Sequence, residues 1–344
     1  MTRWLLLGVL LPLITMPHAA VAAENATSAA QRLMKATPAA AQAKLVQPFT
    51  DEARSDWHYT PRQRAGVAWK DMSAEQQAAA TELLRTALTA QGLDKVRAVM
   101  ALEIALREIE SRSSRDPENY AIAIFGTPGD AQAGWGWRIE GHHLSLHWTL
   151  RGDAYVSSLP QFFGANPARA PRDFGTQVRA GSRVLGAEED RGFLLLRSLS
   201  PEQRKTAIFD TKPYGDILTR NAAKVSPLEP KGIPFAQLGP EQQALLLSLI
   251  STFAEHLNPD LATARLARVR AGGLESVRFG WAGGVEPGAP YYFRIQGAAF
   301  LIELDNSGGN HIHSAWRDFA GDWGRDTLAE HYRESGPDHP HTAR

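Results

Sequence analysis

The sequence predicts an α+β protein of two related halves, each a helical pair followed by an antiparallel β-meander. Two observations predict this fold. Similar helix-initiating segments recur along the chain, and two of them lead through a second helical stretch into alternating, strand-like segments. Helices grouped ahead of strands favour α+β over a parallel α/β fold. The 344 residues are 43% hydrophobic and 22% charged, which is enough apolar material for a core.

The predicted organisation begins with a signal peptide over residues 1–23. A basic start precedes the apolar run from Trp4 to Met16, and small residues follow it up to Ala23. A membrane anchor is the alternative, but this run is shorter than the roughly 20 residues that span a bilayer. We therefore expect a periplasmic or secreted protein without stable membrane insertion.

The remaining chain is expected to form one α+β domain over 69–332, flanked by two short segments. A helical or extended lead-in covers 24–68, and a disordered tail covers 333–344. Within the domain, the related halves are about 72–150 and 238–306, and they are connected by 151–237. Glycine, proline and arginine are frequent in the first part of this connection, which is expected to cover a polar sheet face.

Three helices are predicted from the similar segments Ser73-Ala-Glu-Gln, Ser200-Pro-Glu-Gln and Gly239-Pro-Glu-Gln. A serine three residues before a glutamine is a capping box, and proline is tolerated at the first helical position. After the first and third of these helices, second helices are predicted over 94–110 and 261–269. Strand patterns follow each second helix.

A β-hairpin is predicted around a two-residue turn at Glu140-Gly141, which would place Arg138 opposite His143. Alternation then sorts the side chains onto two faces. The core face holds Trp135, Trp137, Ile139, Leu144, Leu146 and Trp148, and the polar face holds Arg138, Glu140, His143, Ser145 and His147. A second hairpin sorts similarly, with Arg294, Glu303 and Asp305 opposite its apolar residues.

Two histidine clusters predict a metal site. His311 and His313 point the same way in an extended segment, so both imidazoles can reach one ion. His143 is the expected third ligand, with His142 as its alternate. His143 and His147 would lie about 13 Å apart along a strand, so at most one of them belongs to the site. Imidazole ligands suit zinc, iron or copper. A metal-free, hydrogen-bonded polar site is the alternative.

Charge and cysteine content exclude several classes of function. Lys+Arg and Asp+Glu both number 37, so the chain lacks the basic excess of a general nucleic-acid binder. Without any cysteine it cannot form disulfides, thiolate metal sites or a cysteine nucleophile. No dinucleotide or Walker motif is present, so no nucleotide cofactor is expected.

Further polar residues near the clusters are candidates for the chemistry. Asp318 or Asp322 could act as a general base or orient a histidine. Arg138 and Arg317 could position an anionic or polar substrate. Asn166 could bind a ligand, although a turn-forming asparagine in the predicted turn 162–167 is the favoured interpretation.

Three motifs resemble the uncharacterised domain of unknown function 3500 family. They are the segment 136–146, the segment Phe162-Phe-Gly-Ala-Asn-Pro-Ala, and Asn310-His-Ile-His-Ser-Ala-Trp-Arg-Asp-Phe with the following Gly-Asp-Trp-Gly. The resemblance extends from about Trp69 to His331. It implies no established activity. In the family pattern, asparagine is more frequent than histidine at position 147, which argues against His147 as a ligand.

These observations predict an exported, His-ligated metal-dependent enzyme acting on a small or polar substrate. Hydrolysis is favoured over redox chemistry on prior frequency alone. A non-catalytic ligand-binding module is the alternative function. In a third interpretation, the histidines only hydrogen-bond the two halves together.

Overall fold

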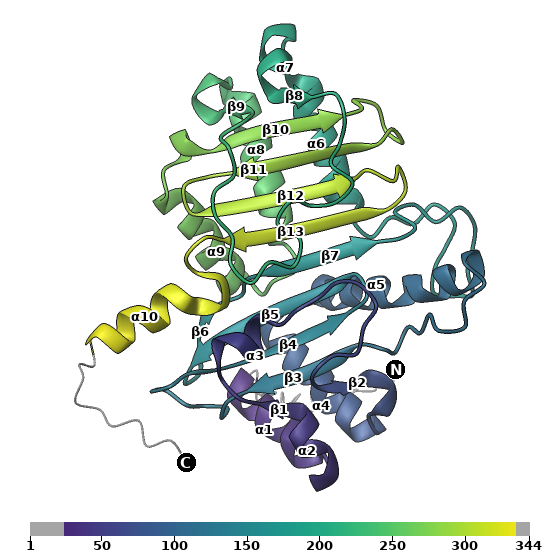
Figure 1. Cartoon of the computed structure of the whole chain (residues 1–344), viewed down its shortest axis with the longest axis vertical. Helices are drawn as coiled ribbons and strands as arrows, with labels where there is room; N and C mark the ends of the chain where they lie inside the picture. Colours follow the sequence, from purple (N-terminus) through teal and green to yellow (C-terminus); the bar gives the residue numbers. More distant parts are fainter. Residues whose placement is uncertain (1–23, 335–344) are drawn as a thin grey trace, which may run out of the picture.

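The computed structural model describes residues 24–334, so the predicted signal peptide and all but two residues of the predicted tail lie outside the described residues. A single sheet runs through the molecule (Figure 1), and most of its strand pairs are antiparallel. Its strands are, in spatial order, β1 (Val46–Gln47), β3 (Ala121–Phe125), β4 (Trp135–Gly141), β5 (Leu144–Arg151), β7 (Gln161–Ala165), β13 (Ile312–Asp318), β12 (Phe300–Asn306), β11 (Tyr291–Gln296), β10 (Arg278–Gly283) and β8 (Ile208–Asp210). The α+β prediction is confirmed.

Three short strands pair at the sides of this path. They are β2 (Val67–Ala68) on β3, β6 (Ala154–Ser157) on β5 and β9 (Ile233–Pro234) on β10. Among the strand pairs of residues 24–334, only β1–β3 and β8–β10 are parallel. The centre of the sheet is the antiparallel pair β7–β13, which joins the earlier strands to the later ones.

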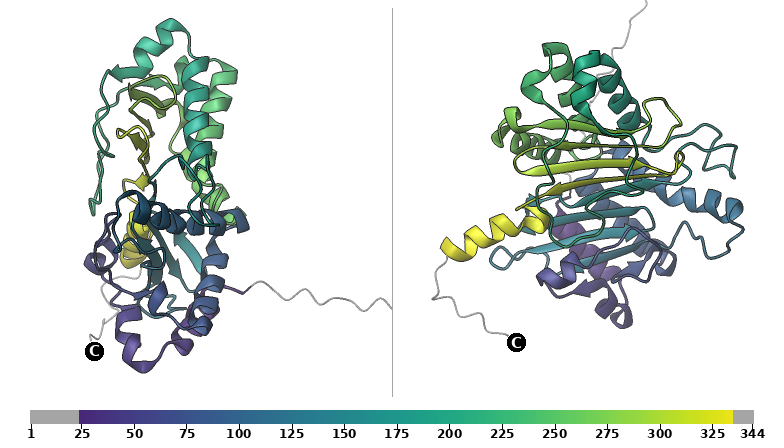
Figure 2. Two further views of the ribbon diagram at one scale, coloured as in Figure 1. Left: turned by 90° about the vertical axis from the view of Figure 1, so that its right-hand side faces the viewer. Right: turned by 45° about the horizontal axis from the view of Figure 1, so that its top comes forward.

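Helices pack against one face of the sheet, and long loops cross the opposite face (Figure 2). The helices are α1 (Ala26–Ala36), α2 (Ala39–Leu45), α3 (Asp51–Ser55), α4 (Ala74–Ala87), α5 (Ala90–Ile109), α6 (Gly186–Ser198), α7 (Pro201–Ala207), α8 (Pro240–Thr252), α9 (Pro259–Ala271) and α10 (Arg325–Glu334). Within residues 24–334, no helix has both the length and the apolar character needed to cross a bilayer.

The predicted helix starts are present. Ser73 and Ser200 each form a capping box with the glutamine three residues later, and α8 begins at Pro240. The second helices begin earlier than predicted, because Thr89 and Asn258 act as N-caps for α5 and α9. The apolar faces of these helices are buried against the sheet and belong to one hydrophobic core.

The register predicted for the first hairpin is wrong. Gly141 pairs with Leu144, and Arg138 faces His147 rather than His143. The turn lies two residues further on, at His142 and His143. Gly141 stays in the strand because the Tyr120 ring occupies the space of a Cβ atom, 2.0 Å away. The glycine therefore serves close packing and not the turn.

The two faces predicted for this hairpin are nevertheless retained along its strands. Moving the turn changes every cross-strand partner by four residues, for example from His143 to His147 opposite Arg138. An even shift leaves each side chain on its original face, because strand alternation has a period of two. Only His143 leaves the polar strand face and enters the turn.

The turn predicted at 162–167 is also wrong over its first four residues. Phe162 to Ala165 belong to β7, which pairs with β5 on one side and β13 on the other. The segment is short and lies between Pro160 and Pro167, so its sequence reads as a loop. Its central position comes from tertiary pairing.

Candidate metal centre

Three histidine side chains converge where the β4–β5 turn meets the start of β13. Nε2 of His143 lies 2.9 Å from Nε2 of His311 and 3.2 Å from Nε2 of His313. One ligand atom from each ring lies within 4.8 Å of the others. Nitrogens bound at 2.0–2.1 Å to a tetrahedral ion lie about 3.3 Å apart. These three side chains could therefore hold a metal ion.

The position of His143 depends on its neighbours in the fold. Its backbone has φ 61°, a left-handed conformation that is uncommon outside glycine. Its N–H donates to the carbonyl of Tyr59 at 2.8 Å, and its carbonyl accepts from the N–H of Gly164 at 2.7 Å. A Cβ atom on Gly164 would lie 2.8 Å from the His143 ring. The glycine in β7 thus makes room for this imidazole.

His313 is oriented by a carboxylate that sequence reasoning missed. Oδ1 of Asp216 lies 2.7 Å from Nδ1 of His313, and the hydroxyl of Tyr59 donates to Oδ2 at 2.9 Å. Because a carboxylate accepts, Nδ1 carries the hydrogen and Nε2 keeps its lone pair for a metal. Burial tends to raise the pKa of Asp216, but the hydrogen bonds from His313 and Tyr59 lower it overall.

The electrostatics favour neutral imidazoles. Burial, reinforced by the neighbouring histidines, lowers the pKa of His143 well below its ordinary value. Burial and the proximity of His313 lower the pKa of His311 to about 4. Neutral imidazole is the form that binds metal ions. At neutral pH these two rings therefore keep lone pairs available for a ligand.

Comparison with known proteins identifies the family. The family model described as "Protein of unknown function (DUF3500)" matches residues 19–325. The chain belongs to the DUF3500 family. No curated protein and no solved structure matches it. The predicted family resemblance is therefore confirmed, and the arguments about the site rest on its geometry.

In this DUF3500 chain the alternate ligand His142 lies beside the three converging histidines, but its side chain is hydrogen-bonded to Glu103. Its ring stacks on that of His143, with centroids 3.7 Å apart. Its Nδ1 lies 2.5 Å from Oε1 of Glu103 and 3.1 Å from Nη1 of Arg115. Nδ1 therefore donates to the carboxylate. The structure brings His142 next to the site and turns its Nδ1 toward α5.

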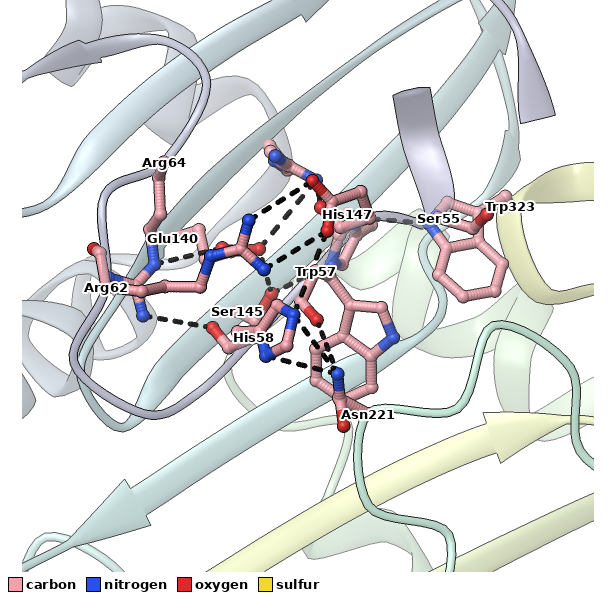
Figure 3. A network of polar contacts seen from close by, with 12 residues as sticks. Ser55, Trp57, His58, Arg62, Arg64, Glu140, Ser145, His147, Asn221 and Trp323 are labelled. Atoms are coloured by element: carbon pink, nitrogen blue, oxygen red, sulfur yellow. Dashed lines mark hydrogen bonds and ion pairs between the residues drawn. The ribbon is translucent and has the colours of Figure 1, made fainter. Parts of the chain in front are cut away.

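His147 belongs to a separate buried network on the polar face of β4 and β5 (Figure 3). Its Nδ1 accepts from Nε1 of Trp323 at 3.3 Å, and its Nε2 lies 2.9 Å from Oγ of Ser145. Since the indole can only donate, the His147 hydrogen is on Nε2 and points to Ser145. Ser145 in turn donates to Glu140 at 3.1 Å. A serine nucleophile needs the opposite proton direction.

The DUF3500 chain buries Arg138 in the same network. Its Nη1 donates to the carbonyl of Asp56 at 2.6 Å and lies 3.8 Å from Oε2 of Glu140. Glu140 also accepts from Nε of Arg64 at 2.9 Å. Figure 3 shows the segment carrying Arg62 and Arg64 lying across these strands. Arg138 is therefore engaged with this covering segment and not with the three histidines.

The predicted catalytic carboxylates Asp318 and Asp322 lie at the other end of β13. Asp318 is five residues beyond His313, about 16 Å at the rise of a strand. It pairs with Arg268, and Asp322 pairs with Arg317 at 2.7 Å. Both of these pairs stabilise the turn after β13. The structure does not bring these residues together with the histidines.

Asn166 lies nearer to the site. It follows Ala165, whose partner in β13 is Ile312, so it stands at the His311 end of the central pair. It is half-buried. A binding role for Asn166 stays a prediction.

Sequence reasoning missed Tyr59, Glu103, Arg115 and Asp216. Two of these, Tyr59 and Asp216, come from loops without a periodic pattern. Their contacts join residues 157 and 97 positions apart in the chain. No spacing rule predicts such a contact. An acidic residue in the long connection was the one available signal, because metal-binding histidines commonly have a carboxylate partner.

Proposed function

We propose that this DUF3500 protein is an exported, metal-dependent enzyme whose ion is held by His143, His311 and His313. The single observation that carries the proposal is the convergence of three Nε2 atoms at metal-ligand spacing. Three histidines leave a coordination position for water or substrate, as in catalytic zinc sites. Zinc, iron and copper all suit these ligands.

The proposed reaction class is hydrolysis of a small, polar substrate. A metal ion in such a site supplies an activated water or polarises a substrate oxygen. Asp216 would hold His313 in the ligating tautomer, and Tyr59 would hold Asp216. Redox chemistry is the less favoured reaction, on the prior frequency of the two reaction classes alone.

The second candidate function is ligand binding without turnover. It is supported by a cleft of about 1010 Å³ that reaches His142, next to the histidine site. A binding module would use the same polar side chains and would need no reaction. A substrate screen with metal-loaded protein separates the two functions, because only the enzyme yields product.

The decisive experiment is metal analysis by elemental mass spectrometry. The protein would begin at Glu24, end at Tyr332 and carry no histidine tag. The variant His311→Ala/His313→Ala would be compared with His147→Gln, a matched change outside the site. We expect nearly one metal ion per chain, lost in the double variant and retained in His147→Gln. Circular dichroism would confirm that both variants fold.

Two outcomes contradict the proposal. No metal after challenge with zinc, copper, iron and nickel would exclude a metalloenzyme. Equal metal content in all three proteins would place the ion elsewhere. If the double variant is only less stable and the wild type is metal-free, the histidines serve to hydrogen-bond the two parts of the sheet.

Export is part of the proposal and has its own test. The N-terminal sequence supports it through its basic start, apolar run and small residues before position 24. Fractionation of expressing bacteria, with mass spectrometry of the mature N-terminus, would detect cleavage near Ala23. An intact N-terminus in the cytoplasmic fraction would contradict it.

We also propose that the two parts of the domain arose by duplication. Two runs of elements support this: β2, α4, α5 and β3–β5 are matched in order by β9, α8, α9 and β10–β12. An isolated bridge joins Leu88 to Leu257, and each lies between the two helices of its run. Superposition of the two segments in an experimental structure would test the relationship.

A further inference from the structure

A cleft of about 1010 Å³ opens beside the histidine site. Its walls come from α2, the segment 61–68, the end of α5 with the loop that follows it, and the His142 turn. This volume matches clefts that bind small molecules. None of the three converging histidines lines it, so the cleft is a separate feature of the molecule.

Positive side chains outnumber negative ones along this cleft. The lining cations are Lys44, Arg62, Arg64, Lys70, Arg112 and Arg115, and the lining carboxylates are Asp71, Glu103 and Asp116. Clefts lined by one sign of charge attract ligands of the opposite sign. The lining therefore favours an anionic ligand.

Three of these cations, which have weak ion pairs or none, are available to such a ligand. In the part of the chain that the structure describes, Lys44 has no ion-pair partner. Arg112 is 3.9 Å from its nearest carboxylate oxygen, on Glu110, and its side chain is 68% exposed. Lys70 pairs with Asp116 at 3.3 Å in a partly exposed contact. Exposed pairs of this kind contribute little and can be exchanged for a ligand.

The other cations are committed to protein partners. Arg64 binds the buried Glu140, and Arg62 binds Asp56 outside the cleft. Arg115 makes a two-point contact with Glu110, with both nitrogen–oxygen distances at 2.9 Å. These arginines raise the positive potential of the cleft without being its docking groups.

His142 offers a polar atom at the inner end. Its Nδ1 is held by Glu103, and among residues 24–334 no side chain or backbone group is hydrogen-bonded to its Nε2. Because His142 lines the cleft, this nitrogen is available to a bound molecule. Because the His142 ring stacks on that of His143, only the His142 imidazole would separate such a molecule from the three converging histidines.

We propose that this cleft binds a small organic anion through a carboxylate or phosphate group, with Lys44, Lys70 and Arg112 contacting its charge and His142 hydrogen-bonding its polar part. The inference goes beyond the metal site and does not depend on it. Carboxylate and phosphate share the anionic oxygens that ammonium and guanidinium groups recognise.

Isothermal titration calorimetry with citrate, inorganic phosphate and neutral glycerol tests the proposal. The variant Lys44→Gln/Arg112→Gln removes the two least-paired cations. The matched control is Lys35→Gln/Arg85→Gln, which removes one lysine and one arginine that do not line the cleft. We expect saturable binding of citrate or phosphate that weakens about tenfold in the first variant and weakens further with added salt. The control should bind as the wild type does.

His142→Gln gives an independent readout, because it removes the imidazole Nε2 at the inner end of the cleft and leaves every lining lysine and arginine in place. Weaker binding in this variant supports contact with the inner end of the cleft. Binding of neither anion at tens of millimolar, or equal binding by Lys44→Gln/Arg112→Gln and the wild type, would overturn the proposal. Preference between citrate and phosphate distinguishes the two anionic groups.

The titrations are repeated with chelator-treated and zinc-loaded protein. Equal binding by both forms supports the cleft, and it does so even if the three histidines take up no metal. Binding that requires zinc would identify the anion as a metal ligand. That result would overturn the cleft proposal while supporting the metal site.

Discussion

Asp216 accepts a hydrogen bond from Nδ1 of His313 at 2.7 Å and so ties a long loop to the central strand β13. The same loop is fixed two residues later, where Glu303 accepts from the backbone N–H of Leu218 and Thr219. Glu303 therefore fixes the backbone close to Asp216, and Tyr59 holds the Asp216 carboxylate itself. This relationship leads to the first prediction.

Asp216→Asn is expected to weaken zinc binding by roughly 10–100-fold while the protein stays folded. An amide can present its NH2 group to His313, and the ligating tautomer is then no longer enforced. Competition with a fluorescent zinc chelator would measure the change. Asp94→Asn is a matched control, because the Asp94 side chain is 75% exposed. Equal affinities for the two variants would contradict the orienting role.

Gly164→Ala should disturb the candidate metal centre at His143, whereas Asp216→Asn acts at His313. The new methyl group would lie 2.8–2.9 Å from atoms of the His143 side chain, closer than real Cβ contacts. We expect a loss of about 1–3 kcal/mol in the free energy of unfolding, together with weaker zinc binding. Urea unfolding and metal titration would measure both.

Gly272→Ala serves as the control for that change. Gly272 has φ −74°, and the nearest atom to its new methyl group lies at 3.6 Å, an ordinary contact. It should fold and bind zinc like the wild type. If Gly164→Ala also behaves like the wild type, the proposed fit between β7 and the His143 ring is wrong.

Metal removal is expected to lower thermal stability without unfolding the protein at room temperature. The three ligands join the β4–β5 turn to β13, so only the folded chain offers all of them to one ion. A ligand at one hundred times its Kd stabilises the folded state by about 2.7 kcal/mol. Scanning calorimetry should show a rise of roughly 4 °C on adding zinc to chelator-treated protein. The His311→Ala/His313→Ala variant should show no rise.

The pH dependence of stability can be tested at a histidine outside the metal centre. His256 is buried against Phe163, and burial, aided by Arg265, lowers its pKa well below 6.5. Unfolded chains titrate this group near 6.5, so below that pH the unfolded state binds a proton that the folded state does not. The contribution of His256 to stability is therefore present above 6.5 and is lost as the pH falls.

A comparison of wild type with His256→Gln isolates this effect from the carboxyl groups. Among these, buried groups with raised pKa values, such as Glu140 and Glu303, act in the opposite direction. The stability difference, wild type minus variant, should shrink by up to about 1.4 kcal/mol per pH unit below 6.5. Urea unfolding at pH 7.5, 6.5 and 5.5 gives the slope. A difference that is constant over this range would show that His256 titrates normally.

Local sequence rules predicted the helices and the two faces of the hairpins, because capping and alternation depend on near neighbours. They failed at Gly141, where packing against Tyr120 decides the conformation. The error moved the turn by two positions and left the faces intact. It concealed only that His143 lies in the turn.

For the candidate site, the spacing of His311 and His313 was informative because both lie on one extended segment. Their meeting with His143 depends on the pairing of β7 with β13, which no local pattern encodes. The closeness of Asp318 and Asp322 to His313 in sequence suggests that they share its site, but their positions in the structure do not. A strand carries such residues steadily away from one another, at about 3.3 Å per residue.

The central position of β13 has a consequence for the order of assembly. His143 and His311 are 168 residues apart, and contacts of such long range form slowly. Until β13 is in place, β7 leaves one edge unpaired, and a growing or truncated chain offers an ion one of its three imidazoles. An ion that needs all three would therefore join a nearly finished molecule, so its uptake would report that the two parts of the sheet have closed.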